Sequence, residues 1–143
     1  MTLKPLVDLI TEFEGLRLES YKCPAGIWTI GYGSTGNDIG PGLVWTEAQC
    51  LERCEKDSLF AIEQAKRLCP ALVGNQLAAV ADFVYNLGAG RLATSTLRKK
   101  INAGDMVGAE AEFSRWVFTR GVKMPGLVRR REAERLLFAN QEH

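Results

Sequence analysis

The chain has 143 residues, of which 46% are hydrophobic and 24% charged, and its 18 Lys and Arg against 17 Asp and Glu give a formal net charge of +1. This length and composition exclude a disordered chain and indicate about one globular domain. The near-neutral charge argues against a dedicated nucleic-acid binder. No apolar run reaches the roughly 18–20 residues that span a bilayer, and residues 1–10 lack a signal-peptide pattern, so we expect no stable membrane insertion of this chain.

The first third of the chain changes from a helical to an extended pattern. Apolar residues at helical spacing predict a helix over residues 3–14, which ends before Gly15. The stretch 17–44 contains aromatic, β-branched and glycine residues and the turn Pro24-Ala25-Gly26. This stretch predicts a small antiparallel sheet.

From residue 46 onward the pattern is helical. Thr46 and Gln49 form a capping box that opens a helix over 46–68, with Trp45 placed as a hydrophobic staple. Further helices are expected over 77–87 with Asn75 as the N-cap, from Thr94 or Ser95 to near Gly104, from Asp105 to about 117, and over 127–140 after a loop at 121–126. Trp28 and Trp116 are expected to be core residues.

This order of elements predicts an α+β fold. We expect a small antiparallel sheet lobe over about 15–45 and a larger helical lobe over about 46–143, which also includes the N-terminal helix. A cleft between two unequal lobes is a usual place for a functional site. The chain is expected to form one catalytic domain over 1–143.

The four cysteines, Cys23, Cys50, Cys54 and Cys69, contain no C-x-x-C pair, and the only histidine is His143, so we expect no structural zinc site. Reduced thiols are one interpretation, and one disulfide that involves Cys69 is the other. On a straight helix Cys69 lies roughly 22–28 Å from Cys50 and Cys54 at 1.5 Å per residue. A disulfide allows a Cα separation of about 7 Å at most. We therefore predict that Cys69 bonds to neither and that the thiols are reduced.

Glu14 is the first candidate for chemistry, because it ends the predicted N-terminal helix. The negative end of the helix dipole disfavours an ionised carboxylate there. A protonated carboxylic acid is what general-acid cleavage requires. The alternative is a solvated helix-end glutamate, and Glu12 and Glu19 are competing acids by spacing.

Cys23 lies nine residues after Glu14, where the first predicted strand enters its turn, and Thr29 lies six residues further on the next strand. A short hairpin can bring a turn residue and a facing-strand residue to one mouth of the cleft. A packed thiol before Pro24 is the alternative interpretation of the cysteine.

These residues form a recognisable signature. Eight residues separate Glu14 from Cys23, and five separate Cys23 from Thr29, which lies within Trp28-Thr29-Ile30-Gly31-Tyr32-Gly33. This pattern resembles that of the phage lysozymes of glycoside hydrolase family 24, which is Glu, eight residues, Asp or Cys, five residues, Thr. The resemblance continues, in order, through residues 85–88, 95–97, 101–105, 113–116 and 125–132. It implies an endolysin of a phage or prophage, a muramidase that hydrolyses the β-1,4 bond between N-acetylmuramic acid and N-acetylglucosamine in peptidoglycan. It implies no cofactor and no metal.

The resemblance also implies roles for the three signature residues. Glu14 is expected to be the general acid, Cys23 a base or electrostatic partner, and Thr29 the hydroxyl that positions the attacking water. Many family members have Asp at the position of Cys23, and a thiol can replace a carboxylate only as a thiolate, whereas a free thiol has a pKa of about 8.5. Covalent attack by Cys23 is the alternative.

Other side chains are expected to bind substrate or to support the acid. By resemblance, one of the three arginines at 129–131 pairs with Glu14, and Arg130 is the one that we expect. The positions that match the sugar cleft of the family are Tyr85, Asn86 and Thr96, and Tyr32 and Thr35 lie at the mouth of the predicted sheet. A core position for Tyr85 and a turn cap for Tyr32 and Thr35 are the alternatives.

Three function hypotheses follow. The first is the muramidase, expected to be a monomer that stays in the host cytoplasm until a holin-type pore opens the membrane and that acts in the periplasm or cell wall. The second is a catalytically weak cell-wall-binding module on the same fold, which the cysteine in place of aspartate keeps open. The third is a small DNA-binding helical protein that uses residues 97–100 and 129–131, and the near-neutral charge counts against it.

Overall fold

The computed structural model describes residues 2–140. Its elements in chain order are α1 (Leu3–Glu14), β1 (Arg17–Lys22), β2 (Trp28–Gly31), α2 (Glu47–Leu68), α3 (Gly74–Leu87), α4 (Ala89–Ala93), α5 (Thr96–Asn102), α6 (Met106–Glu112), the 3-10 turn η1 (Phe113–Arg115), β3 (Phe118–Thr119), β4 (Val122–Lys123) and α7 (Pro125–Ala139). The last part of the predicted helical lobe, residues 141–143 with His143, lies outside the described residues.

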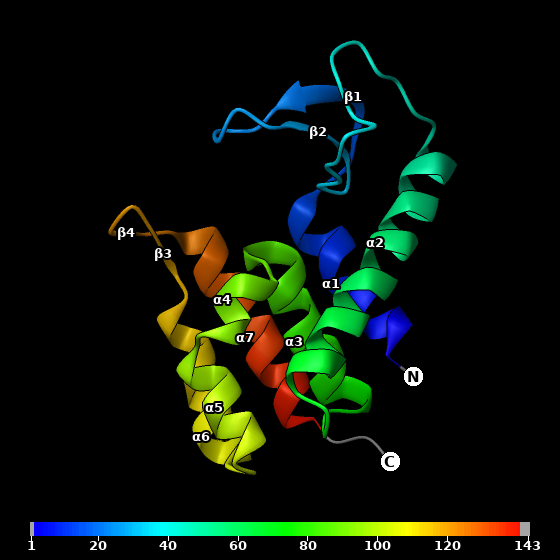
Figure 1. Ribbon diagram of the computed structural model, residues 1–143. Helices are drawn as coiled ribbons and strands as arrows, with labels where there is room; N and C mark the ends of the chain where they lie inside the picture. The colour runs from blue at the N-terminus through cyan, green and yellow to red at the C-terminus, as the bar shows by residue number, and fades with distance from the viewer. Residues whose placement is uncertain (1, 141–143) are drawn as a thin grey trace.

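The two predicted lobes are present. In Figure 1 the hairpin β1–β2 and the loop that follows it stand at the top, and the helices gather below, with α2 descending from one group to the other. The predicted α+β fold with a small sheet lobe and a larger helical lobe is confirmed. The predicted helix over 3–14 and the capping box of α2 are also confirmed, because Thr46 accepts from the backbone N–H of Gln49 and the Gln49 side chain accepts from the N–H of Thr46.

The sheet is smaller than predicted. Within the predicted range 17–44, only β1 and β2 pair as strands, antiparallel, with Tyr21 opposite Thr29. The second half of the predicted sheet, over 32–44, is a loop that touches the hairpin at single bridges. The glycines explain the difference, since Gly33 and Gly36 have φ of 77° and 144°, which a regular strand does not adopt.

Helix boundaries differ from the prediction in the helical lobe. Asn75 does not cap α3, because the helix begins at Gly74, three residues before the predicted start, and its N-cap is Val73. Instead, the Asn75 amide donates to the carbonyl of Asn140 at 2.9 Å and ties α3 to the end of α7. Ser95 and Asp105 cap α5 and α6 as predicted, by accepting from backbone N–H groups three residues ahead.

The last third holds elements that the prediction lacked. The short helix α4 follows α3 directly. The helix predicted from Asp105 to about 117 ends at Glu112, and residues 118–123 form the hairpin β3–β4 instead of part of a loop. Helix α7 begins at Pro125, two residues earlier than predicted, because a proline fits the first turn of a helix.

The core of the helical lobe surrounds α3, whose residues 77–84 are all buried. Phe83 meets Phe113 and Trp116 edge to face, at ring-centre distances of 6.3 and 5.2 Å. The predicted core position of Trp116 is therefore confirmed in part, since its ring is half-buried against this core. Trp28 and Trp45 are half-buried in the sheet region and lie beside Lys22 and Arg53.

All four cysteines lie within the described residues and are unpaired in the structure. Cys50, Cys54 and Cys69 are fully buried, whereas Cys23 is half-buried. No helix within residues 2–140 combines the length and the apolar character needed to cross a membrane.

Removing the cap of α2 should lower stability measurably. Thr46→Ala deletes the side-chain oxygen that accepts from Gln49, so we expect the free energy of unfolding to fall by about 1 kcal/mol in urea denaturation. Ser114→Ala is the matched control, because Ser114 is exposed and caps no helix. Equal stability of the two variants would contradict a contribution from the cap.

Candidate active site

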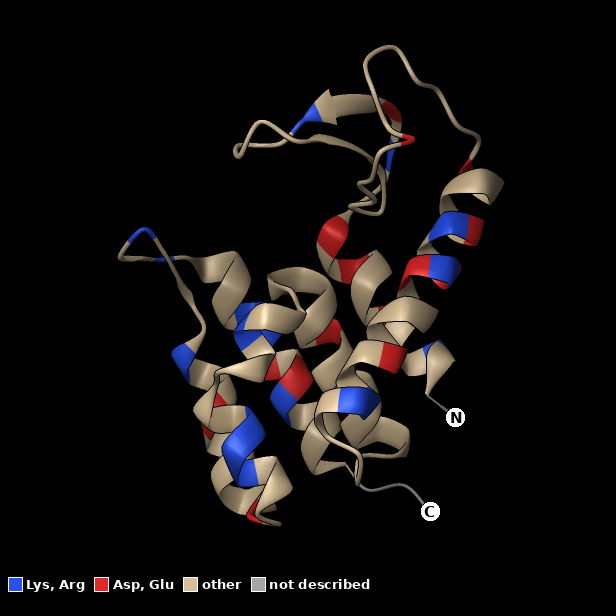
Figure 2. Ribbon diagram, in the orientation of Figure 1, with Lys and Arg blue, Asp and Glu red and all other residues tan. Residues whose placement is uncertain are grey.

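Glu14 lies at the end of α1 that faces the sheet lobe, and Figure 2 shows acidic residues at this end of the helix. Arg130 of α7 donates from Nη1 to Oε2 of Glu14 at 2.7 Å, which is the pairing that we expected. The arginine side chain is 5% exposed and the glutamate 21%, so the carboxyl is partly open to solvent while its partner is not. The ion pair fixes the direction of the Glu14 side chain.

The other oxygen of Glu14 lies against the loop after β2. A Cβ atom at Gly33 would come within 2.5 Å of Oε1 of Glu14, and the φ of Gly33 is 77°. Both the space and the backbone conformation therefore require glycine at this position. The Glu14 carboxyl is held between this loop and Arg130.

Arg130 is itself held from behind by Asp82 of α3. The Arg130 guanidinium donates from Nε and Nη2 to the two oxygens of Asp82 at 2.9 and 2.8 Å. This is the two-bond geometry that makes an arginine–carboxylate pair directional. Asp82 is fully buried.

Cys23 begins the turn between β1 and β2. Its N–H donates to the carbonyl of Ile27 at 2.9 Å, and Gly26, at φ 80°, closes the turn. Hydrogen bonds from the backbone N–H groups of Ile27, Ala25 and Gly26 and from the Thr29 side chain lower the pKa of the Cys23 thiol, against a smaller opposing effect of burial. The turn thus favours the thiolate.

Thr29 lies beside the cysteine on β2 and is almost fully buried. Its hydroxyl donates to the carbonyl of Ile27 at 3.0 Å, and its proximity contributes to the lowered pKa of the Cys23 thiol. The hairpin therefore brings Cys23 and Thr29 together, as the sequence predicted.

A cleft of about 980 Å³ opens at this place. Its lining includes Glu14 and Phe13 of α1, Pro24 next to Cys23, Asn86 of α3, Thr119 and Met124 beside the hairpin β3–β4, and residues of α7 up to Leu136. The acid, the turn after Cys23 and the helical lobe thus share one cleft, which confirms the predicted cleft between the lobes.

Tyr85 and Tyr32 join the two lobes. The Tyr85 phenol donates to the carbonyl of Tyr32 at 2.6 Å, and burial raises its pKa well above the ordinary value. Tyr85 and Thr35 line a second hollow, of about 270 Å³, together with Gly33 and Phe60. The position of Tyr85 combines a core contact with an exposed edge.

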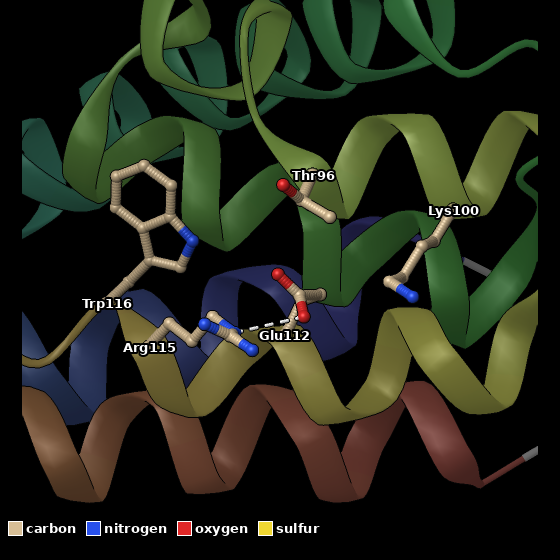
Figure 3. Close-up of a pocket in the computed structure, with 5 residues that line it drawn as sticks. All are labelled: Thr96, Lys100, Glu112, Arg115 and Trp116. Atoms are coloured by element: carbon tan, nitrogen blue, oxygen red, sulfur yellow. Dashed lines mark hydrogen bonds and ion pairs between the residues drawn. The ribbon is translucent and has the colours of Figure 1, made fainter.

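Asn86 and Thr96 lie in different surroundings. Asn86 lines the cleft that contains Glu14, and its Oδ1 accepts from Nη2 of Arg131 at 2.7 Å. Thr96 does not line that cleft. It lines a separate hollow of about 480 Å³, and Figure 3 shows it there with Lys100, Trp116 and the ion pair of Glu112 and Arg115.

Comparison with known proteins identifies the family. The family model for phage lysozymes matches residues 11–134. The chain belongs to the phage lysozyme family. It is 42% identical over 135 residues to an endolysin of Acyrthosiphon pisum secondary endosymbiont phage 1, covering 91% of this chain and 92% of that one. It is 42% identical over 123 residues to a SAR-endolysin of Bacteriophage PS119, covering 85% and 74%.

Solved structures agree with this phage lysozyme assignment. The muramidase domain of SpmX from Asticaccaulis excentricus superimposes with a TM-score of 0.90 at 28% identity, over 99% of both chains. The active form of the P1 phage endolysin Lyz superimposes with a TM-score of 0.83 at 28% identity, over 96% of this chain and 84% of that one.

Sequence reasoning missed Asp82 and Gly33 in this phage lysozyme. Asp82 is the only charged residue in the apolar run 77–87, and that isolation is the signal that could have identified it. Gly33 carried no separate signal among several neighbouring glycines. Within residues 2–140, no group of three or more His, Cys, Asp or Glu side chains could hold a metal ion.

The surroundings of the thiols predict selective alkylation in the native protein. Cys23 is half-buried with a lowered pKa, whereas burial raises the pKa of Cys50, Cys69 and, to about 11, Cys54. Iodoacetamide near neutral pH should therefore modify Cys23 alone in the folded protein and all four cysteines in denaturant, as counted by mass spectrometry.

Cys23→Ala is the control for this experiment and should remove the rapid modification of the folded protein. Rapid modification of a second thiol in the folded protein, or fewer than four reactive thiols after unfolding without reductant, would contradict the assignment.

Proposed function

We propose that this chain is a peptidoglycan muramidase of the endolysin type, which hydrolyses the β-1,4 bond between N-acetylmuramic acid and N-acetylglucosamine. One observation carries the proposal. A carboxyl group fixed by a buried arginine, Glu14 with Arg130, lies in the same open cleft as the turn that holds Cys23, in a chain of the phage lysozyme family. The proposed catalytic domain is the whole chain, 1–143.

In the proposed mechanism, Glu14 is the general acid. Its carboxyl protonates the glycosidic oxygen as the bond to the sugar breaks and positive charge develops on the sugar ring. Arg130 and Gly33 limit the carboxyl to one orientation, so that the proton points into the cleft.

Cys23 completes the reaction as a thiolate. Negative charge on its sulfur stabilises the developing positive charge or accepts the proton of the attacking water, and the turn amides that lower its pKa keep this form available. The Thr29 hydroxyl can exchange its bond to the Ile27 carbonyl for one to that water. Covalent attack by the sulfur remains the second mechanism, and it predicts retention at the sugar.

The glycan binds in the cleft along Asn86 and the first turns of α7. Asn86 offers its amide N–H groups, because Arg131 already occupies its oxygen. The exposed edge of Tyr85 and the loop with Tyr32 and Thr35 offer further contacts on the side of the second hollow. Thr96 would contact only a substrate that reaches the separate hollow beside Trp116.

The site of action follows from the substrate. Relatives of this chain are SAR-endolysins, and we place this protein in the periplasm or cell wall at the time of lysis. In the proposed route the monomeric protein stays in the host cytoplasm until a holin-type pore opens the membrane. The alternative of a weak wall-binding module is not favoured, since binding alone does not require a positioned acid such as Glu14.

Glu14→Gln tests the acid directly. The amide keeps the shape and an oxygen for Arg130 but has no acidic proton, so lysis of cell-wall substrate should fall by at least roughly 10²-fold while the fold is kept. Glu19→Gln is the matched control, because Glu19 is exposed on β1 and should retain activity. A zymogram and a turbidity assay measure the activity of both variants. Activity of Glu14→Gln equal to that of the parent would contradict the assignment of Glu14 as the general acid.

Replacing Cys23 separates its possible roles. Cys23→Asp should keep substantial activity because a carboxylate with a pKa near 4 is ionised at neutral pH, whereas Cys23→Ala should lose most activity. Activity of the parent should rise with pH as the thiolate forms, beginning below the usual thiol pKa, and Cys23→Asp should lack this rise. Rate measurements across pH on purified peptidoglycan test both expectations.

Two further measurements distinguish the mechanisms for Cys23. A glycosyl adduct on the sulfur in mass spectrometry, with retention of the anomer, would establish covalent attack. Activity of Cys23→Ala equal to that of the parent would remove the cysteine from the mechanism and leave Glu14 with a water held by Thr29.

A further inference from the structure

Behind the pair of Glu14 and Arg130 lies a cluster of four buried charged residues, which we call the buried network: Asp82, Arg130, Arg131 and Glu134. They come from α3 and α7, and each has at most 4% of its surface exposed. Burying this many ionisable groups costs free energy unless each one is paired or neutral. The contact of Arg130 with Glu14 explains one member of the buried network, and the burial of the other three needs a separate explanation.

Arg130 connects the network to the site. Its guanidinium gives two hydrogen bonds to Asp82 and a third to Glu14, so the direction of the third bond depends on the first two. A planar guanidinium held at one edge by a buried carboxylate has little freedom to turn. The orientation of Glu14 thus depends on Asp82, which does not line the cleft.

Glu134 of α7 lies next to Asp82 in the buried network. The carboxyl groups of the two residues are adjacent and fully buried, within range of a hydrogen bond between them. Two carboxylates cannot form such a bond, because each is an acceptor only, so one of the pair must carry a proton. Asp82 accepts two bonds from Arg130 and is the better placed of the two to be ionised, which leaves the proton on Glu134.

The oxygens of Glu134 agree with this assignment. Oε2 accepts from Nη2 of Arg131 at 3.1 Å. Oε1 lies 2.9 Å from Nε of Arg131, but the contact lacks hydrogen-bond geometry, and within the described residues this buried oxygen accepts no hydrogen bond. An oxygen that carries a proton and donates it to Asp82 needs no donor of its own.

The surroundings of the two carboxyl groups support the same conclusion. Burial, the bond to Asp82 and its negative charge raise the pKa of Glu134 well above the usual range. Burial alone would raise the pKa of Asp82, but the bonds from Glu134 and Arg130 and the charges of both arginines lower it overall.

We propose that Asp82 and Glu134 share one proton, which stays on Glu134, and that this carboxyl pair positions Glu14 through Arg130. Arg131 extends the same network to the cleft wall, since one nitrogen, Nη2, donates to both Glu134 and Asn86. Asp82 and Glu134 are positioning residues that do not touch the substrate. The proposal rests on the proposed function for its effect on activity, but the protonation of Glu134 can be measured without any activity.

Asp82→Asn is the first test. The amide leaves Arg130 with one good acceptor and removes a negative charge, so kcat should fall roughly tenfold to hundredfold while KM changes little. Glu14 contacts Arg130 of α7, lies near Tyr85 of α3, and shares the cleft with the turn after Cys23. With Asp82 neutral, the charge of Arg130 should favour the ionised form of Glu14 more strongly. The alkaline limb of the kcat profile, which is the fall in kcat as Glu14 loses its proton, should therefore move to lower pH by roughly one pH unit.

Glu134→Gln is the rescuing variant. An uncharged amide still donates to Asp82 and still offers an oxygen to Arg131, so kcat should stay within about threefold of the parent and the alkaline limb should not move. Glu110→Gln is the matched control, because it also removes one carboxylate partner of an arginine on α7, Arg135 at 2.6 Å, and it does not contact Arg130. It should behave like the parent.

If the parent protein lyses cell walls, these variants test the positioning role and the proton assignment separately. The positioning role of Asp82 would be overturned if Asp82→Asn had the kcat and pH profile of the parent. It would also be overturned if kcat fell but the alkaline limb of the profile stayed in place. A loss of activity or a moved limb in Glu134→Gln would show that the charge of Glu134 matters and would overturn the proton assignment. An inactive parent would contradict the proposed function instead.

Carboxyl ¹³C NMR tests the proton even if Asp82→Asn does not fold. In protein labelled at the glutamate carboxyl carbons, the signal that disappears in Glu134→Gln belongs to Glu134. We expect it at the position of a protonated carboxylic acid at neutral pH and unchanged by titration through the usual glutamate range. A carboxylate signal at neutral pH would overturn the proposal.

Discussion

The guanidinium of Arg130 is almost completely removed from water, and it can stay so because two carboxylates, Asp82 and Glu14, accept its hydrogen bonds. These three residues are 48 and 116 positions apart in the chain, so one side chain links the first helix, the central buried helix and the last one. An unpaired buried charge is strongly destabilising, about 3–5 kcal/mol when one partner of a buried pair is removed. The same cost that favours packing of α1, α3 and α7 also orients the acid.

The sheet lobe is tied to the helical lobe by a second arginine. Arg53 of α2 donates to Asp57 on its own helix at 3.0 Å and to Asp38 and the carbonyl of Thr35 on the loop after β2, at 2.6 and 2.8 Å. Ser34 donates to Asp57 at 2.8 Å from the same loop. Gly33, which lies against Glu14, is therefore anchored to α2 through its neighbours. The site is bounded on one side by this loop and on the other by Arg130.

Local signals in the sequence were sufficient for many of the elements. The helix over 3–14 and the capping box at Thr46 depend on neighbouring residues, and both formed as predicted. The strand pattern over 32–44 failed because positive φ angles at Gly33 and Gly36 override the side-chain pattern. The hairpin β3–β4 was missed because two strands of two residues leave almost no alternation to detect.

The site was predictable only as far as its motif extends. The spacing of Glu14, Cys23 and Thr29 identifies the signature, and Arg130, the expected arginine, pairs with Glu14. The buried network was not predictable in this way, since the pairing of Asp82 with Glu134 joins two helices 52 positions apart along the chain and depends on packing. A single aspartate in an apolar helix shows that a partner exists but does not say which residue it is.

The turn that holds Cys23 has a consequence for the chemistry of this position. Its amide groups belong to the backbone, and they attract any negatively charged atom placed at the end of a short side chain. Sulfur and oxygen anions can both accept hydrogen bonds from these amides. The turn therefore favours any short side chain that places a negative charge there, whether sulfur or oxygen carries it. A hairpin of this kind lets aspartate and cysteine replace one another through a change of one side chain, while the rest of the molecule stays as it is.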